Sequence, residues 1–191
     1  SQEFIQRMRS IPLGLSQKEY RTIQKYRTTQ KNFDVFWVGS FKTHSIREDA
    51  AKHLREVGER AGLTLCMPEG RVSGQEFFEL AAQSRVVLSP GGAGWDCLRH
   101  VQSFAVGSLP FISEPSIHTR LWWQMPRELF FRNDLSDFRD GLHRLLELSK
   151  DSSFFEQTAA TIESNFLWHH SMHYGLHEAG FAPCYREGTM V

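Results

Sequence analysis

Short apolar runs alternate with amphipathic stretches along most of the chain from residue 34 onward. The runs Val35–Val38, Leu63–Met67, Val86–Leu88 and Leu109–Ile112 are separated by stretches with apolar residues at helical spacing, and Leu129–Phe131 is a candidate fifth strand. Continuously apolar runs of this length are typical of strands buried on both faces of a parallel sheet. Strands and helices in alternation predict βαβ units, and hence an α/β, Rossmann-like parallel sheet with helices on both faces.

Several residues mark where the expected helices begin and end. Ser45 with Glu48, and Ser73 with Glu76, have the three-residue spacing of a capping box. Gly62 follows the apolar series of the first helix and is expected to end it. Apolar spacing predicts two further helices, one over residues 138–146 and one from about residue 151.

The composition is that of an ordinary globular domain. The 191 residues are 40% hydrophobic, and 22 basic side chains balance 22 acidic ones, so the chain as a whole is not a polyanion binder. No apolar run approaches the roughly 18–20 residues of a membrane span. Three widely spaced cysteines favour reduced thiols over disulfides. We expect a cytoplasmic protein, or a lumenal one if an N-terminal anchor has been removed.

Charge and pattern divide the chain into three parts. Residues 1–31 hold seven basic and two acidic side chains and form a basic arm or linker, residues 32–150 form the Rossmann-like domain, and residues 151–191 form a C-terminal helix and tail. The arm allows contact with nucleic acid, but its modest charge density and the absence of a recognised motif favour a solvated helix or linker.

A glycine-rich loop follows the third strand and opens the next helix, which is expected from about Asp96 to Val106. Gly91, Gly92 and Gly94 allow backbone N–H groups to approach an anion near the positive end of that helix. Arg99 and Gln102 lie one turn apart on the same helix face. The set suits a diphosphate joined to a ribose. The alternative is a glycine-rich turn with Arg99 solvated or paired to an acid.

This loop is neither a P-loop nor the dinucleotide fingerprint, because it lacks Gly-Lys-Ser/Thr and the GxGxxG spacing. The stretch from Arg71 to Ser113 instead resembles the nucleotide-sugar-binding C-terminal half of GT-B glycosyltransferases, and most closely the exostosin-like and family 1-type enzymes. The positions that carry the resemblance are Pro90, Gly91, Gly94, Asp96, Arg99, Gln102, Gly107 and Pro110.

The resemblance implies roles for particular residues. Arg99 would bind the donor phosphate and act in catalysis, and the position of Gln102, usually glutamate in the family, would bind the donor ribose. Gln102 departs from the family and loses a charge-assisted bond. The full substrate-binding set is Ser40, Arg71, Ser73, Ser89, Gly91, Gly92, Gly94, Asp96, Arg99 and Gln102.

The loops after the first two strands supply the outer members of this set. Ser40 and Lys42 could meet phosphate or acceptor, or form a simple turn with a solvated lysine. Arg71 and Ser73 follow the second strand, where family members often hold the nucleobase, or are a surface arginine and a helix cap. Trp122 and Trp123 are expected to be packing residues, with a border of a sugar pocket as the alternative.

Four-residue spacing places three histidines, His169, His173 and His177, on one face of the last helix, which is a spacing that can hold a metal. A polar helix face is the favoured interpretation, and the resemblance implies a metal-independent enzyme without a cofactor. The implied function is donor binding for glycosyl transfer to a saccharide or other hydroxyl acceptor, with a second domain or partner subunit completing the enzyme. The alternative is a non-catalytic binding or scaffold domain that retains the GT-B half fold.

Overall fold

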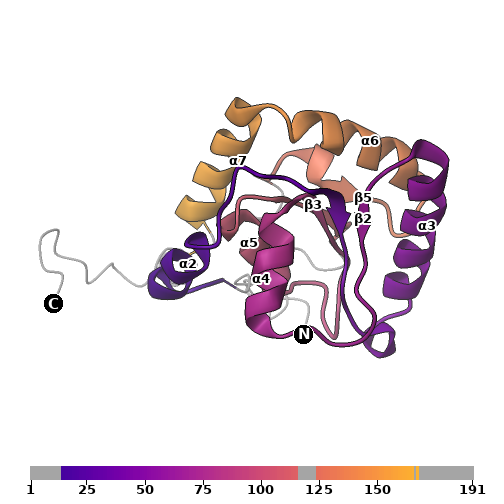
Figure 1. Cartoon of the computed structure of the whole chain (residues 1–191), viewed down its shortest axis with the longest axis horizontal. Helices are drawn as coiled ribbons and strands as arrows, with labels where there is room; N and C mark the ends of the chain where they lie inside the picture. Colours follow the sequence, from indigo (N-terminus) through magenta and orange to yellow (C-terminus); the bar gives the residue numbers. More distant parts are fainter. Residues whose placement is uncertain (1–13, 116–123, 166, 168–191) are drawn as a thin grey trace, which may run out of the picture.

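A five-stranded parallel sheet forms the centre of the protein. The computed structural model describes residues 14–115, 124–165 and 167 (Figure 1). The strand order is β2-β1-β3-β4-β5, and the strands are β1 Phe33–Phe36, β2 Leu65–Cys66, β3 Ser84–Ser89, β4 Leu109–Ser113 and β5 Phe130–Phe131. The chain moves outward from β1 to β2 and then returns past β1 to β3, so the order reverses between β1 and β3. In open parallel sheets, ligands bind beside this reversal, at the carboxyl ends of the strands.

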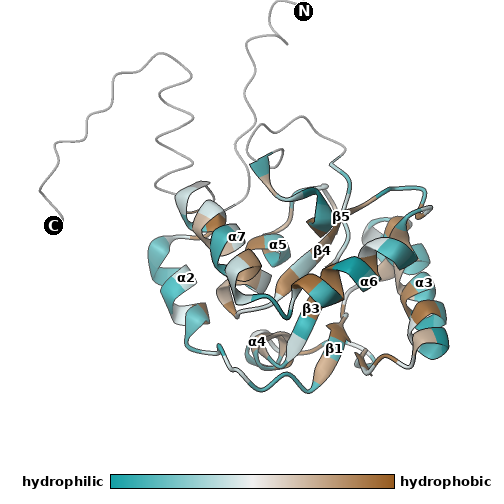
Figure 2. Cartoon of the chain, turned by 90° about the horizontal axis from the view of Figure 1, so that it is seen from above, coloured by the Kyte–Doolittle hydropathy of each residue, from teal (hydrophilic) through white to brown (hydrophobic). Residues whose placement is uncertain are grey.

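Helices cover both faces of the sheet, as the sequence predicts. The helices α3 and α6 pack together on one face, and α2, α4 and α7 each contact α5 or its neighbours on the other (Figures 1 and 2). The helices are α2 Gln17–Gln24, α3 Ile46–Ala61, α4 Gly74–Ala82, α5 Leu98–Ala105, α6 Phe138–Leu148 and α7 Ser152–Asn165, with the one-turn 3-10 helices η1 Phe41–Thr43 and η3 Arg127–Leu129. The predicted α/β, Rossmann-like fold is therefore confirmed.

The two predicted capping boxes have different outcomes. Ser73 accepts a hydrogen bond from the Glu76 N–H, and the Glu76 carboxylate accepts one from the Ser73 N–H, so the box that opens α4 is confirmed. The box at Ser45 is wrong. Ser45 itself has right-handed helical backbone angles and makes no side-chain cap, while Nδ1 of His44 accepts from the Ile46 N–H at 3.2 Å.

Residues 14–31 are packed onto the domain. The helix α2 lies against α5 and opens with a capping box between Ser16 and Glu19. Its Tyr20 and Ile23 are buried in the core, together with Leu15, which pairs with Leu167 in an isolated bridge. This part of the predicted arm therefore belongs to the domain.

Two basic side chains of this segment close the carboxyl ends of helices. Arg27 donates to the carbonyls of Ala105 and Phe104 at the end of α5. Lys31 Nζ donates to the carbonyls of Ala82 and Gly107 at 2.6 and 2.8 Å, and burial lowers the pKa of Lys31 to about 8. Cations are favourable at these helix ends, which are the negative ends of the helix dipoles.

The predicted histidine cluster and the Trp122–Trp123 pair lie outside the described residues. No helix in the described ranges is both long and apolar enough to cross a membrane.

The core is formed by the central strands and the inner helix faces, with Phe36, Phe104, Phe111, Phe131 and Phe138 among its largest fully buried side chains.

Candidate functional site

A pocket of about 880 Å³ opens at the carboxyl ends of β1 and β2. We call it the arginine pocket. Its walls come from the loop after β1, the loop after β2, the start of α4, and single side chains of α3 and α5. Four cationic side chains line it, Lys42, Arg55, Arg71 and Arg99, against one acidic residue, Glu69. No carboxylate in the described part of the chain forms an ion pair with any of the four, so the pocket suits an anionic ligand.

Arg99 is the innermost of these cations. It is the second residue of α5, and its guanidinium lies 5.2 Å from the ring centroid of Trp37 and 5.8 Å from that of Phe77. Its Nε and Nη1 are buried and have no hydrogen-bond partner among the described residues. Buried donors of this kind are costly unless a partner satisfies them, and aromatic faces compensate only part of that cost.

A second guanidinium lies against the same tryptophan. Arg47, in the first turn of α3, is centred 6.0 Å from the Trp37 ring. Its Nε donates to the Gly91 carbonyl at 2.8 Å and its Nη1 to the Ser40 carbonyl at 3.3 Å. Arg47 therefore connects the loop after β1 to the loop after β3. Together with Arg99, it places two guanidinium groups against the ring of Trp37.

Burial has the largest effect on the pKa values of Arg99 and Arg47. Burial lowers the pKa of Arg99 to about 10, with Cys97 raising it and Arg47 lowering it further. The pKa of Arg47 is also lowered by burial. Both side chains remain cationic at neutral pH, so two positive charges are held close together at the point where the strand order reverses.

The arginine pocket brings together four of the ten predicted site residues: Ser40, Arg71, Ser73 and Arg99. The Ser40 hydroxyl accepts from the Lys42 N–H, and the Ser73 hydroxyl accepts from the Glu76 N–H. Each hydroxyl keeps its own proton to donate to a ligand. The predicted alternative of a helix cap is thus correct for Ser73, and it does not remove the side chain from the pocket.

A smaller pocket, of about 320 Å³, is also lined by Arg99. It is lined by Arg47, Cys97, Arg99 and Gln102, together with Gly74 and Phe77, which it shares with the arginine pocket. The predicted pairing of Arg99 and Gln102 on one helix face is therefore confirmed. Burial raises the pKa of the Cys97 thiol, although Arg99 and Arg47 act in the opposite direction.

The glycine-rich loop differs from its prediction, because two of its amides already have protein partners. The Gly91 N–H donates to Ser113 Oγ at 3.0 Å, and the Gly92 N–H donates to the Gly94 carbonyl at 2.7 Å. These two amides are not free to hold a phosphate. The helix expected from about Asp96 is present, but it begins two residues later, at Leu98.

Close packing explains why glycines stand in this loop. A Cβ added to Gly92 would lie 2.7 Å from Nη2 of Arg47, and one on Gly91 would lie 3.3 Å from Cα of Trp95. Both glycines are buried, whereas Gly94 is exposed and a Cβ there would meet nothing within 4 Å. The loop thus fits around protein side chains, and of its glycines only Gly94 is open to solvent.

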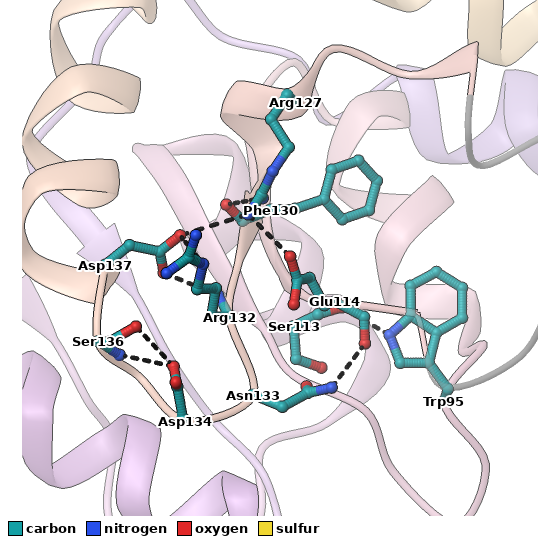
Figure 3. A network of polar contacts seen from close by, with 10 residues as sticks. All are labelled: Trp95, Ser113, Glu114, Arg127, Phe130, Arg132, Asn133, Asp134, Ser136 and Asp137. Atoms are coloured by element: carbon teal, nitrogen blue, oxygen red, sulfur yellow. Dashed lines mark hydrogen bonds and ion pairs between the residues drawn. The ribbon is translucent and has the colours of Figure 1, made fainter.

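A third pocket, of about 380 Å³, lies beside this loop and is lined by residues that include Gly91–Trp95, Ser113 and Asn133. Figure 3 shows a polar network that includes three of its lining residues, Trp95, Ser113 and Asn133. Arg127 pairs with Glu114 at 2.8 Å and Asp137 at 3.3 Å, and Trp95 Nε1 donates to the Ser113 carbonyl at 2.6 Å. Because Glu114 and Asp137 are paired with arginines, these two carboxylates are poor candidates for a general base.

Ser89 and Asp96, two further members of the predicted set, lie outside all three pockets. Ser89 is fully buried, and its hydroxyl lies 2.8 Å from Nδ1 of His100. Because His100 Nε2 lies 3.1 Å from the Trp95 carbonyl, Nε2 is the donor and Nδ1 accepts from Ser89. Ser89 is therefore structural rather than ligand-facing. Asp96 is half-buried near His100, and its charge opposes the effect of burial, which lowers the pKa of His100 to about 4.

Sequence reasoning missed several residues that shape the site. Arg47 lies within the expected capping box, and Trp37 lies within the expected apolar strand, so neither residue suggested a ligand site. Arg55 belongs to the solvent side of an amphipathic helix, where an arginine carries no signal. Arg47 could have been predicted as a site residue, because the first turn of the helix after β1 lies at the edge of a parallel sheet where ligands bind.

Neither protein-family models nor curated proteins give a match to this chain. No group of His, Cys, Asp and Glu side chains within the described ranges could hold a metal ion.

Proposed function

We propose that this chain is the donor-binding domain of a GT-B glycosyltransferase, and that the arginine pocket holds the diphosphate of a nucleotide-diphospho-sugar. The observation that supports this best is Arg99, a cation with buried donors and no hydrogen-bond partner among the described residues, at the wall of a basic pocket. A diphosphate would supply both the missing charge and the missing acceptors. Its place beside the reversal of strand order is where such sheets bind nucleotides.

Cations and hydroxyl groups of the arginine pocket would contact different parts of the nucleotide. Arg99 and Lys42 would hold phosphate oxygens, and the hydroxyls of Ser40 and Ser73 would donate to phosphate or ribose. This differs from the arrangement expected from the sequence, in which backbone amides of the glycine loop held the diphosphate. Side-chain cations take that role because the amides of Gly91 and Gly92 are occupied.

Arg99 would also act in the transfer step. The oxygen of an acceptor hydroxyl forms a bond to the anomeric carbon of the sugar, and the bond from that carbon to the phosphate oxygen breaks. The electron pair leaves with the nucleoside diphosphate, and the acceptor proton goes to a base. Arg99 would stabilise the charge that develops on the leaving diphosphate. In the GT-B arrangement, the base that takes the acceptor proton usually comes from a second domain.

The alternative is a binding or scaffold domain that keeps the fold without the chemistry. Two observations favour it: the satisfied amides of Gly91 and Gly92, and the glutamine at position 102 in place of the usual glutamate. Such a domain would not bind a nucleoside diphosphate, whereas a donor-binding domain would.

Titration calorimetry with uridine diphosphate tests the proposed function. Arg99→Ala should weaken binding by at least tenfold, on the order of 1.4 kcal/mol. The matched control is Arg85→Ala, since Arg85 pairs with Asp34 near the amino end of β3 and lines none of the three pockets. Equal affinities of the Arg99 variant and the parent contradict the assignment of Arg99. Failure of the parent to bind any of a panel of nucleoside diphosphates and nucleotide sugars favours the scaffold.

A further inference from the structure

Phe41 is an aromatic side chain exposed at the wall of the arginine pocket. It is 42% exposed, and Leu98, at 41%, is the other large hydrophobic side chain with such exposure in the described part of the chain. Phe41 belongs to η1, a single turn that Ser40 caps and that begins five residues after the end of β1. Its position is set by this short turn, and it lines the pocket together with the neighbouring Lys42.

The ring of Phe41 is stacked on a buried ring below it. The centroids of Phe41 and Trp37 are 6.4 Å apart and their planes differ by 23°. Trp37 is only 3% exposed, and its indole also carries the guanidinium of Arg99 at 5.2 Å. An exposed flat ring and a buried cation are thus both placed against the same indole.

This arrangement matches the two chemically distinct parts of a nucleotide. A base has a flat π face that stacks on aromatic side chains whatever its identity, and its phosphates are one ribose away. The large exposed area of Phe41 is unfavourable in water, and covering it with a base would remove that cost. A ligand with phosphates but no flat ring would leave Phe41 uncovered.

We propose that Phe41 is the platform on which the nucleobase of the ligand stacks while the diphosphate lies at Arg99, an assignment that rests on the proposed function. Phe41 then supplies affinity for the face of the base and does not read its edge. The site accordingly binds uridine, adenosine and guanosine diphosphates with affinities within about tenfold of one another, because stacking is tolerant of base identity.

The test compares uridine diphosphate with inorganic pyrophosphate, which has the charge but no base. Titration calorimetry on Phe41→Ala should show uridine diphosphate binding weakened by roughly tenfold, with pyrophosphate binding unchanged. Phe41→Trp should retain uridine diphosphate binding, since it keeps a flat aromatic face. The matched control is Leu98→Ala, which removes the other exposed hydrophobic side chain and should change neither affinity.

Three results overturn the platform. One is unchanged uridine diphosphate binding by Phe41→Ala, and another is an equal loss of pyrophosphate binding, which would indicate a distorted pocket. The third is a spread of more than about a hundredfold between the three nucleoside diphosphates, because stacking alone does not discriminate to that degree. If the parent protein binds uridine diphosphate and needs Arg99 but not Phe41, the platform is wrong and the proposed function stands. If the parent does not bind, the proposed function itself fails.

Discussion

Two regions at the same edge of the sheet differ in how their hydrogen-bond donors are used. In the glycine loop, the N–H groups of Gly91 and Gly92 are satisfied by Ser113 and Gly94. In the arginine pocket, two donors of Arg99 are buried without a partner in the described part of the chain. The protein itself thus supplies acceptors for these two loop amides, whereas the two buried donors of Arg99 still lack an acceptor in the described part of the chain.

The difference shows that a glycine-rich turn can serve internal packing. Gly91 and Gly92 are buried against Trp95 and Arg47, so the absence of side chains serves internal packing. Arg47 connects the two regions, because it donates to the Gly91 carbonyl on one side and lies over Trp37 on the other. Substitutions along this connection should therefore separate structural roles from binding roles.

Arg47→Met should have the largest effect. It removes two charge-assisted hydrogen bonds and leaves the buried Gly91 carbonyl without its donor. We expect the free energy of unfolding to fall by about 3 kcal/mol or more, because each of the two bonds to this charged group contributes about 1.5–3 kcal/mol. Urea denaturation measures the loss. Arg60→Met, an exposed arginine on the same helix, is the control, and equal stability of the two variants would show that Arg47 does not hold the loops together.

His100 should make the glycine-loop side of the site sensitive to acid. Its pKa is about 4 in the folded protein and ordinarily 6.5, so unfolding takes up a proton between these values. Stability is fully present above about pH 6.5 and falls by about 2–3 kcal/mol as the pH drops to about 4. His100→Gln should flatten this part of the stability profile relative to the parent, as measured by denaturation at several pH values. An unchanged profile, with exposed His143→Gln as the control for loss of a histidine, would be evidence against a buried neutral His100.

Gly92→Ala should cost about 1–2 kcal/mol of stability, in the range of overpacked sites. The new Cβ would lie 2.7 Å from Arg47 Nη2, and that guanidinium cannot easily move because it is held by the Gly91 and Ser40 carbonyls. Thermal unfolding measures the loss. A variant as stable as the parent would mean that the contact between Gly92 and Arg47 is loose.

Gly94→Ala should have the smallest effect on stability, and it tests whether the glycine loop holds the phosphates. No atom lies within 4 Å of the added Cβ, and Gly94 is not among the residues with positive φ. We expect stability within about 0.5 kcal/mol of the parent and uridine diphosphate affinity within about twofold. If the phosphates were held by the glycine loop, the methyl group would enter their space. If calorimetry shows that uridine diphosphate affinity falls by tenfold or more, the phosphates are bound by the glycine loop.

Local patterns were sufficient for most of the fold. The apolar run at Val86–Leu88 predicted β3, and Ser73 with Glu76 predicted the start of α4, because both signals depend on neighbouring residues. The capping box of Ser16 and Glu19 has the same spacing and could have revealed α2. Ser45 failed as a cap because His44, one residue earlier, supplied the acceptor instead.

The candidate site was predictable only in part, because its chemistry depends on distant partners. Arg99 could be placed at the ligand edge since it opens the helix after β3. The satisfaction of the loop amides depends on Ser113, which lies beyond the following helix, and the packing of Gly92 depends on Arg47, on the opposite side of β3 in the chain. No local pattern records such contacts.

The most direct test of the central claim is a crystal structure of the protein soaked with uridine diphosphate. The diphosphate should lie within hydrogen-bonding distance of the Arg99 guanidinium, inside the arginine pocket. A diphosphate bound instead to the backbone of residues 91–94, with Arg99 making no contact to it, would contradict the account.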